Sequence, residues 1–201
     1  DAKETLARAI TSVKNQCIKN KNINIEIIII IDDGKKYKKL IPKVKKNIII
    51  KILKSNGIKT GPGNARNIGI EKAKGEYIGF LDADDQWSSN YLEKMYELVE
   101  QNGIAFSPTR VYENENLIKH FEGRNKGYLT LNDIGHISCS FHPFIRKREQ
   151  KKFKLHSSQD VYNTACLIKR YSKIKMIDGD YYKLNIQKKS VTKQDGFSHK
   201  V

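Results

Sequence analysis

The first hundred residues alternate between two hydrophobic periods. Leu6, Ile10, Val13 and Cys17 recur at helical spacing, which predicts an amphipathic helix at the start of the chain. Residues 27–31 follow as an unbroken run of isoleucine, a pattern typical of a strand buried on both faces of a parallel sheet. The chain is therefore expected to begin with a helix and to continue into a buried strand.

The alternation continues to about residue 110. Residues 48–53 predict a second buried strand, and a glycine-rich segment at 57–64 opens a helix that Gly75 closes. Residues 77–81 predict a third strand, and helical spacing returns before Gly103. Strands and helices in alternation predict a doubly wound α/β sheet, in which ligands bind beyond the carboxyl ends of the strands.

The pattern changes in the second half of the chain. It predicts a hairpin from residues 104–112 and 116–121, an extended strand at 137–146 and a helix at 161–168. No internal repeat and no low-complexity linker separates the two parts. We therefore expect a single domain over residues 1–201, with halves at 1–110 and 111–201.

Composition and charge narrow the class of protein. Isoleucine occurs 27 times among 201 residues, which indicates a chain that folds around a core. The 38 Lys and Arg against 22 Asp and Glu give a net charge of +16, and such a surface attracts phosphate groups. Only seven of these cations are Arg, and no nucleic-acid-binding motif is present, so we expect no nucleic-acid partner.

Cysteine usage and hydropathy bear on location. Three cysteines without paired spacing indicate neither a disulfide framework nor a zinc ribbon. No apolar run reaches the roughly 18 residues that a membrane-spanning helix needs. The opening residues Asp1-Ala2-Lys3-Glu4 do not resemble a signal peptide. We therefore expect a cytoplasmic protein.

Acidic residues follow two of the predicted strands. Asp32 and Asp33 end the first strand, and Asp82-Ala83-Asp84-Asp85 ends the third. Clustered carboxylates repel one another, and a divalent cation such as Mg²⁺ or Mn²⁺ relieves that repulsion. The alternative is that these residues only cap the helices that follow. Two clusters at the same sheet edge favour the cation site.

The segment Gly61-Pro62-Gly63-Asn64-Ala65-Arg66-Asn67 stands at the start of the second predicted helix. Backbone N–H groups at a helix start attract anions, and Arg66 adds a guanidinium in the first turn. Residues 34–70 hold ten Lys and no acidic residue. This flank therefore presents positive charge to a phosphate.

Four segments occur in an order that resembles glycosyltransferase family 2. They are residues 4–16, Ile-Ile-Ile-Asp-Asp-Gly at 29–34, Gly-Pro-Gly-Asn-Ala-Arg-Asn-Ile-Gly-Ile at 61–70, and Gly-Glu-Tyr-Ile-Gly-Phe-Leu-Asp-Ala-Asp-Asp at 75–85. The resemblance implies an α/β GT-A fold with a mostly parallel central sheet and an inverting, metal-dependent enzyme. It is dense up to about residue 100 and thinner afterwards. The family's first strand is expected to be missing, since Asp1 lies just after its place.

The resemblance also implies roles for individual residues. The donor-binding positions fall on Asp32, Asp33, Arg66, Asp82, Asp84 and Asp85. Within this set, Asp32 and Arg66 contact the nucleoside, while Asp82 and Asp84 match the D-x-D motif that holds Mn²⁺ or Mg²⁺ and the donor diphosphate. Trp87 and His142 fall near the acceptor. Residues 1–110 become the nucleotide-sugar-binding half and residues 111–201 the acceptor-binding half.

Asp160 occupies the place of the family's catalytic base. It follows Gln159, which replaces the usual Glu, and it stands at the start of a predicted helix. The alternative is that Asp160 only complements the helix dipole. A late segment around Tyr182 also resembles the family, and we take it as support for the fold alone.

These observations predict an inverting glycosyltransferase whose donor is a nucleotide-sugar, expected to be a UDP-sugar. The acceptor is expected to be a hydroxyl of a glycan or of a lipid-linked molecule. The expected setting is the synthesis of cell-surface polysaccharide or lipooligosaccharide. Basic residues at 146–148 and 151–154 predict peripheral contact with the inner face of the cell membrane, with a solvated surface as the alternative. A second interpretation is a non-catalytic nucleotide-sugar or glycan-binding remnant. A basic nucleic-acid-binding module is a third.

Overall fold

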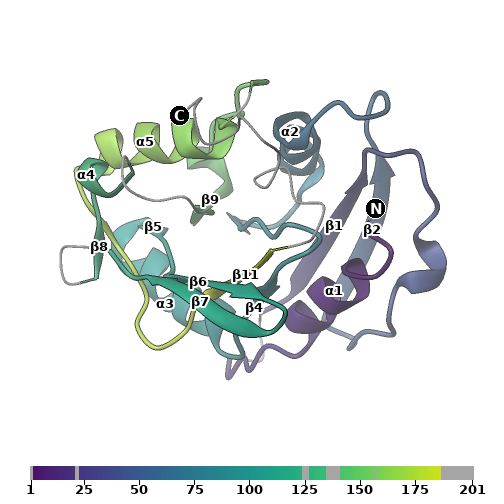
Figure 1. Cartoon of the computed structure of the whole chain (residues 1–201), viewed down its shortest axis with the longest axis horizontal. Helices are drawn as coiled ribbons and strands as arrows, with labels where there is room; N and C mark the ends of the chain where they lie inside the picture. The colour runs from purple at the N-terminus through teal and green to yellow at the C-terminus, as the bar shows by residue number, and fades with distance from the viewer. Residues whose placement is uncertain (1, 21–22, 124–126, 135–140, 157, 187–201) are drawn as a thin grey trace.

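Figure 1 shows the computed structural model, which describes residues 2–20, 23–123, 127–134, 141–156 and 158–186. Its helices are α1 (Leu6–Lys14), α2 (Pro62–Lys72), α3 (Tyr91–Asn102), α4 (Leu131–Ile134) and α5 (Gln159–Tyr171), with short 3₁₀ turns at η1 (Lys38–Leu40) and η2 (Lys147–Glu149). Its strands are β1 (Ile25–Ile31), β2 (Ile48–Lys54), β3 (Tyr77–Ile78), β4 (Gln86–Trp87), β5 (Ile104–Ala105), β6 (Thr109–Glu113), β7 (Asn116–Phe121), β8 (Tyr128–Leu129), β9 (Phe144–Arg146), β10 (Ile174–Lys175) and β11 (Tyr182–Ile186).

The strands β1 and β2 form a parallel pair at one end of the molecule (Figure 1). The register begins with Ile25 opposite Ile48 and continues to the end of both strands. Helix α1 places Leu6 and Ile10 against Ile31 in one apolar cluster. The predicted helix and both strands at this end are confirmed.

A second sheet follows the order β3-β9-β5, with β9 antiparallel to both neighbours. Strand β3 ends at Ile78, earlier than the predicted 81, because the chain leaves the ladder at Gly79. A Cβ built on Gly79 would lie 2.9 Å from the Phe144 ring, so glycine permits this close approach. In the described residues β1 and β3 belong to separate sheets, an arrangement consistent with a missing strand between them.

A third sheet runs β4-β11-β6-β7 and carries the predicted hairpin β6–β7. The predicted strand 104–112 is divided into β5 and β6 by residues 106–108. Pro108 has no N–H to donate to a ladder, which explains a break there. Strand β11 pairs parallel to β6 and antiparallel to β4. It therefore carries residues from the end of the described chain into the middle of the molecule.

Helices α3 and α5 each contribute to a separate apolar cluster of the core. Helix α3 buries Met95 and Val99 completely and ends at Gly103, whose φ of 77° is the left-handed conformation that glycine adopts readily. Helix α5 buries Leu167 and Ile168 in an apolar cluster with residues of β5, β9 and β10. The fold is thus α/β with mixed sheets.

One further predicted strand lies only partly within the described residues, and the described helices also bear on the membrane question. The predicted strand at 137–146 is described from residue 141 onward, where β9 forms its last part. None of the helices in the described ranges has the length and apolar character needed to cross a membrane.

Candidate active site

The acidic residues after β3 form a tight turn, residues 82–85, which we call the acid turn. The backbone N–H of Asp85 donates to the carbonyl oxygen of Asp82 at 3.1 Å, which closes the turn. The turn leads directly into β4, so the sheet fixes one of its ends. Three carboxylates are thereby held within four residues.

Asp82 is engaged by a cation. The Arg66 Nη2 atom lies 2.6 Å from Asp82 Oδ1, and His142 Nε2 lies 3.4 Å from Asp82 Oδ2. Burial alone would raise the pKa of Asp82, but the charge of Arg66, followed by that of His142, outweighs it and lowers the pKa. Asp82 is therefore a firmly ionised carboxylate that already has a partner.

Arg66 joins the two halves of the chain. It comes from the first turns of α2, and its side chain is only 10 % exposed. Burial opposes its charge, yet the carboxylates of Asp82 and then Asp160 raise the pKa of Arg66. Its Nη1 atom is buried and makes no hydrogen bond in the described residues. A donor atom is thus left free beside the acid turn.

Asp84 differs from its neighbours. It is half-buried, and its carboxylate has no side-chain partner among the described residues, accepting only its own backbone N–H. Burial and then the charge of Asp82 raise the pKa of Asp84. A carboxylate in this state gains from a cation, so Asp84 fits a divalent metal ion. Asp82, already bonded to Arg66, fits that role less well.

The described residues include no group of three or more His, Cys, Asp and Glu side chains placed to hold a metal ion. Mg²⁺ in phosphate-binding sites commonly has one or two protein carboxylates and completes its shell with phosphate and water oxygens. The acid turn therefore fits a cation that is shared with a phosphorylated ligand.

Asp85 faces the protein interior. Its Oδ2 accepts a hydrogen bond from the Tyr182 hydroxyl at 2.8 Å, and its Oδ1 accepts one from the backbone N–H of Asn185 at 2.8 Å. Burial, with the charges of Asp82 and Asp84, raises the pKa of Asp85 well above its ordinary value. Asp85 therefore bonds to β11, and a direct role in donor binding stays a prediction.

The first acid cluster is also occupied by the chain itself. Asp32 accepts hydrogen bonds from the backbone N–H groups of Thr60 and Gly61 at 3.0 and 2.9 Å. Burial would raise its pKa, but these bonds, together with one from the Thr60 hydroxyl, lower the pKa of Asp32 to about 2. Asp33 accepts a hydrogen bond from the Tyr37 hydroxyl at 2.6 Å. Asp32 thus fixes the segment that precedes α2, and its role toward a nucleoside stays a prediction.

Asp160 reaches the site from the second half of the chain. It lies half-buried in the first turn of α5, near enough to Arg66 for its charge to raise that pKa. The loop before α5 is held on α2 because the Asn67 side chain bonds both the N–H and the carbonyl of Phe153, at 2.7 and 2.9 Å. A Cβ on Gly63 would lie 2.6 Å from the Lys154 carbonyl oxygen. No pattern in the sequence points to this role of Asn67.

Both predicted acceptor residues pack against other side chains of the protein. The His142 side chain is 1 % exposed, between Asp82 and the Tyr182 ring, whose centroid is 5.0 Å away. Trp87 is partly buried and stacks on Tyr91 with ring centroids 4.7 Å apart. Both side chains therefore support the acid turn and its neighbours, and an acceptor role for either stays a prediction.

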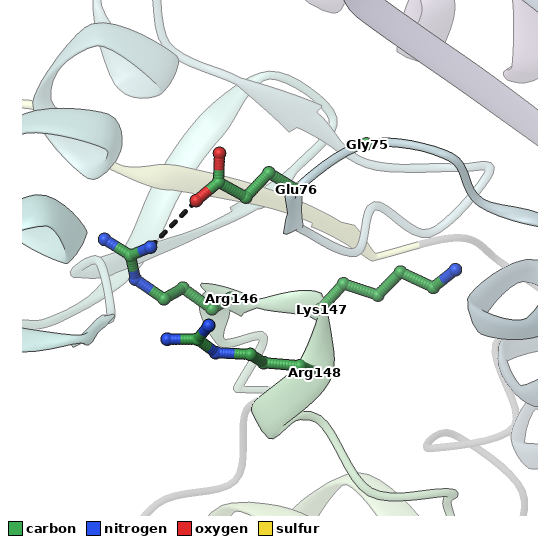
Figure 2. Close-up of a pocket in the computed structure, with 5 residues that line it drawn as sticks. All are labelled: Gly75, Glu76, Arg146, Lys147 and Arg148. Atoms are coloured by element: carbon green, nitrogen blue, oxygen red, sulfur yellow. Dashed lines mark hydrogen bonds and ion pairs between the residues drawn. The ribbon is translucent and has the colours of Figure 1, made fainter.

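The basic residues of η2 line a cavity that lies away from the acid turn. A cavity of about 360 Å³ is lined by Gly75, Glu76, Arg146, Lys147 and Arg148. Figure 2 shows these five residues. Arg146 is paired with Glu76 at 2.8 Å and Lys147 bonds the carbonyl of Ala73, so these two cations already have close partners. Glu76 precedes β3 whereas Asp82 follows it. The cavity is therefore at the opposite end of β3 from the acid turn.

Comparison with known proteins identifies the family. The family model described as "Glycosyl transferase family 2" matches residues 1–175, so the chain belongs to this family. The structure is similar to S. aureus TarS 1-349 in complex with UDP-GlcNAc, with a TM-score of 0.70 at 16 % identity, covering 94 % of this chain and 57 % of that one. GalNAc-T7 with UDP, GalNAc and Mn²⁺ gives a TM-score of 0.64 at 16 % identity and covers 91 % of this chain and 41 % of that one. The predicted GT-A fold is confirmed.

Curated relatives are glycosyltransferases. An uncharacterized glycosyltransferase of Haemophilus influenzae is 40 % identical over 95 residues, which cover 45 % of this chain and 37 % of that protein. The Escherichia coli UDP-Glc:alpha-D-GlcNAc-diphosphoundecaprenol beta-1,3-glucosyltransferase WfaP is 34 % identical over 119 residues, covering 59 % and 45 %. The chain spans less than half the length of these curated relatives.

Proposed function

We propose that this chain binds a UDP-sugar together with Mn²⁺ or Mg²⁺ and forms the catalytic domain of an inverting glycosyltransferase. The observation that carries the proposal is the state of Asp84: a half-buried carboxylate with a raised pKa and no side-chain partner among the described residues, next to an Asp82–Arg66 pair. A relative named for its use of UDP-Glc and a structural neighbour in complex with UDP-GlcNAc support the choice of nucleotide.

Two groups hold the donor in this proposal. Asp84 would hold the cation beside the donor diphosphate, and Arg66, whose side chain is 10 % exposed, would add positive charge next to it. The cation supplies Lewis-acid stabilisation of the charge on the departing diphosphate. Asp32 and Asp33 act on the nucleoside side, where Asp32 fixes the Thr60–Gly61 segment.

Asp160 is the proposed general base. Its carboxylate accepts the proton of the acceptor hydroxyl while the hydroxyl oxygen attacks the anomeric carbon from the face opposite the diphosphate. The bond between that carbon and the diphosphate oxygen breaks in the same step. Attack from the opposite face inverts the anomeric configuration.

Titration of UDP into the chain tests the donor site. We expect calorimetric binding with Mn²⁺ that disappears with EDTA and in the Asp84→Ala variant. The matched control is Asp178→Ala, which removes an exposed carboxylate away from the acid turn and is expected to keep wild-type binding. Equal binding with and without metal would contradict the proposed cation role.

The rival interpretation is a non-catalytic binding domain, and Asp160 separates the two. The Asp160→Asn variant is expected to bind UDP as the wild type does and to lose transfer of sugar to acceptors or water. Wild-type protein that binds UDP-sugars with Mn²⁺ and turns over none of a panel of donors and lipid-linked or glycan acceptors would favour the binding remnant.

A lipid-linked acceptor at a membrane surface is the proposed setting. The loop before α5 carries exposed Lys151, Lys152 and Lys154 beside Leu155, which is 73 % exposed. Cations around an apolar side chain bind anionic lipid surfaces. Replacing Leu155 with Ser and the three lysines with Glu is expected to abolish sedimentation with phosphatidylglycerol vesicles.

Charge reversal elsewhere controls for the loss of net positive charge. Lys36, Lys38 and Lys39, in and just before η1, are exposed, and reversing all three is expected to leave most of the sedimentation intact. Equal loss in both variants would contradict a specific contact through the loop before α5.

A further inference from the structure

Strand β11 reaches the acid turn through two side chains. The Tyr182 hydroxyl accepts a hydrogen bond from the backbone N–H of Asp82 at 3.1 Å and donates one to Asp85 Oδ2 at 2.8 Å. Tyr182 is 2 % exposed, so water does not compete for these bonds. One hydroxyl group therefore ties the first residue of the turn to the last.

Asn185 adds two further bonds from the same strand. Its backbone N–H donates to Asp85 Oδ1 at 2.8 Å, and its side-chain Nδ2 donates to the backbone carbonyl of Asp84 at 2.9 Å. The four bonds from β11 thus contact three residues of the turn. None of them uses the Asp84 carboxylate.

The strand that makes these bonds is itself held on both sides. Tyr182 pairs with Trp87 of β4 and with Thr109 of β6, so the ladder fixes β11 relative to the turn. A ligand group is positioned best when its neighbours are locked by packing and hydrogen bonds. The backbone of the turn is thus fixed, while no described side chain bonds the Asp84 carboxylate.

The burial of Asp85 indicates more than a stability role. A buried carboxylate beside two others is repelled by them, and an amide or apolar side chain would avoid that repulsion. Its two oxygens, however, accept from two separate donors of β11 at once, which orients the turn from both sides. The repulsion between carboxylates lowers the free energy of unfolding, while the bonds to β11 hold the backbone of Asp84 in one orientation.

We propose that Tyr182 and Asn185 are positioning residues that hold the acid turn in the geometry with which Asp84 binds a divalent cation. This inference rests on the proposed function, because it gives the turn a cation to bind. Sequence similarity places Tyr182 only in a segment that supports the fold. Its hydrogen bonds connect it to the site.

The Tyr182→Phe variant tests the inference, with Tyr91→Phe as its matched control. Tyr91 is equally buried at 2 %, and its hydroxyl lies 3.4 Å from Ser107 Oγ, away from the turn. Titrations with Mn²⁺ and UDP are expected to show cation affinity about tenfold or more weaker in Tyr182→Phe, the range for lost outer-sphere partners, and unchanged in Tyr91→Phe. Asn185→Ser, which keeps the backbone donor, is expected to lose less.

Amide hydrogen exchange supplies a second measurement that needs no ligand. Exchange at Asp82 is expected to be about tenfold or more faster in Tyr182→Phe, because that N–H loses its acceptor, and unchanged in Tyr91→Phe. If Tyr182→Phe does not fold, Asn185→Ser carries the cation titration, because its side chain donates to the Asp84 carbonyl. Wild-type cation affinity in the variants would overturn the positioning role alone. A wild-type protein that binds no Mn²⁺ with UDP would overturn the proposed function and this inference together.

Discussion

The two acid clusters follow strands in the same half of the chain, yet the structure uses them differently. Asp32 and Asp33 accept hydrogen bonds from the loop before α2 and from Tyr37, so both carboxylates have partners. In the acid turn, Asp82 has Arg66 and Asp85 has β11, but the Asp84 carboxylate has no side-chain partner among the described residues. The first cluster is bonded within the fold, whereas the second includes one carboxylate that no described side chain bonds.

The comparison shows that the hydrogen bonds and neighbouring charges of an aspartate, and not its residue type, determine whether the fold stabilises its ionised form. Lowering of the pKa marks Asp32 as a carboxylate whose charge the fold stabilises, and raising of the pKa marks Asp84 as one whose charge the fold opposes. By linkage, the charge of Asp32 adds to the free energy of unfolding and the charge of Asp84 subtracts from it. Substitutions in the two clusters should therefore have opposite signatures.

The largest effect on stability is expected at Arg66. The Arg66→Met variant leaves the Asp82 charge, on a side chain that is 35 % exposed, without its closest partner and is expected to lower the free energy of unfolding by about 1.5–3 kcal/mol, the range for hydrogen bonds to charged groups. Urea denaturation measures the change. Arg148→Met, at a side chain that is 77 % exposed, serves as control. An equally small loss in both variants would show that the Arg66–Asp82 pair does not stabilise the protein.

Asp84→Asn is expected to separate binding from stability. Loss of a direct ligand should weaken Mn²⁺-dependent UDP binding by at least about 100-fold, beyond the loss from outer-sphere partners. The free energy of unfolding at pH 7 should stay the same or rise, because the fold opposes this charge. Calorimetry and urea denaturation on the same preparation measure both. A destabilised variant would contradict the contrast between the clusters.

Asp32→Asn is expected to show the reverse signature. An amide accepts fewer hydrogen bonds from Thr60 and Gly61, and loss of bonds to a charged group should lower the free energy of unfolding by about 1–2 kcal/mol. The metal dependence of UDP binding, followed by calorimetry, should persist, because no step of cation binding uses Asp32. A variant of wild-type stability that loses metal dependence would exchange the roles of the two clusters.

The smallest effect concerns pH. The pKa of Asp32 is about 2 in the fold and near its ordinary value when unfolded, so its stabilising contribution is complete above about pH 4 and disappears as the pH falls toward 2. Unfolding curves of the wild type and Asp32→Asn should converge over that range. A difference that stays constant between about pH 5 and pH 2 would mean that the Asp32 charge contributes nothing.

Local patterns predict much of this fold from the sequence. The isoleucine runs of β1 and β2 and the periodicity of α1 and α3 are strong because burial on one face or both leaves a repeating signal. The short strands β8 and β10 escape prediction, since two residues carry no period. The division of β5 from β6 depends on Pro108, whose effect is visible only when the pairing is known.

The candidate site is predictable in its residues more than in its contacts. The D-x-D pattern points to Asp82 and Asp84 together, but the bond from Arg66 to Asp82 distinguishes them. The bonds from Tyr182 to the acid turn join residues about 100 positions apart, and no local pattern records such a pair. Asn67 escapes notice for the same reason, because its partner Phe153 is 86 residues away.

Proton relaxation of water in the presence of Mn²⁺ and UDP tests the central claim most directly, because it detects a protein-bound Mn²⁺ without a turnover assay. Wild type and Asp178→Ala should both show enhanced relaxation that requires UDP, and Asp84→Asn should show none. Enhancement in Asp84→Asn equal to that of the wild type would contradict the assignment of Asp84 as the carboxylate that binds the cation.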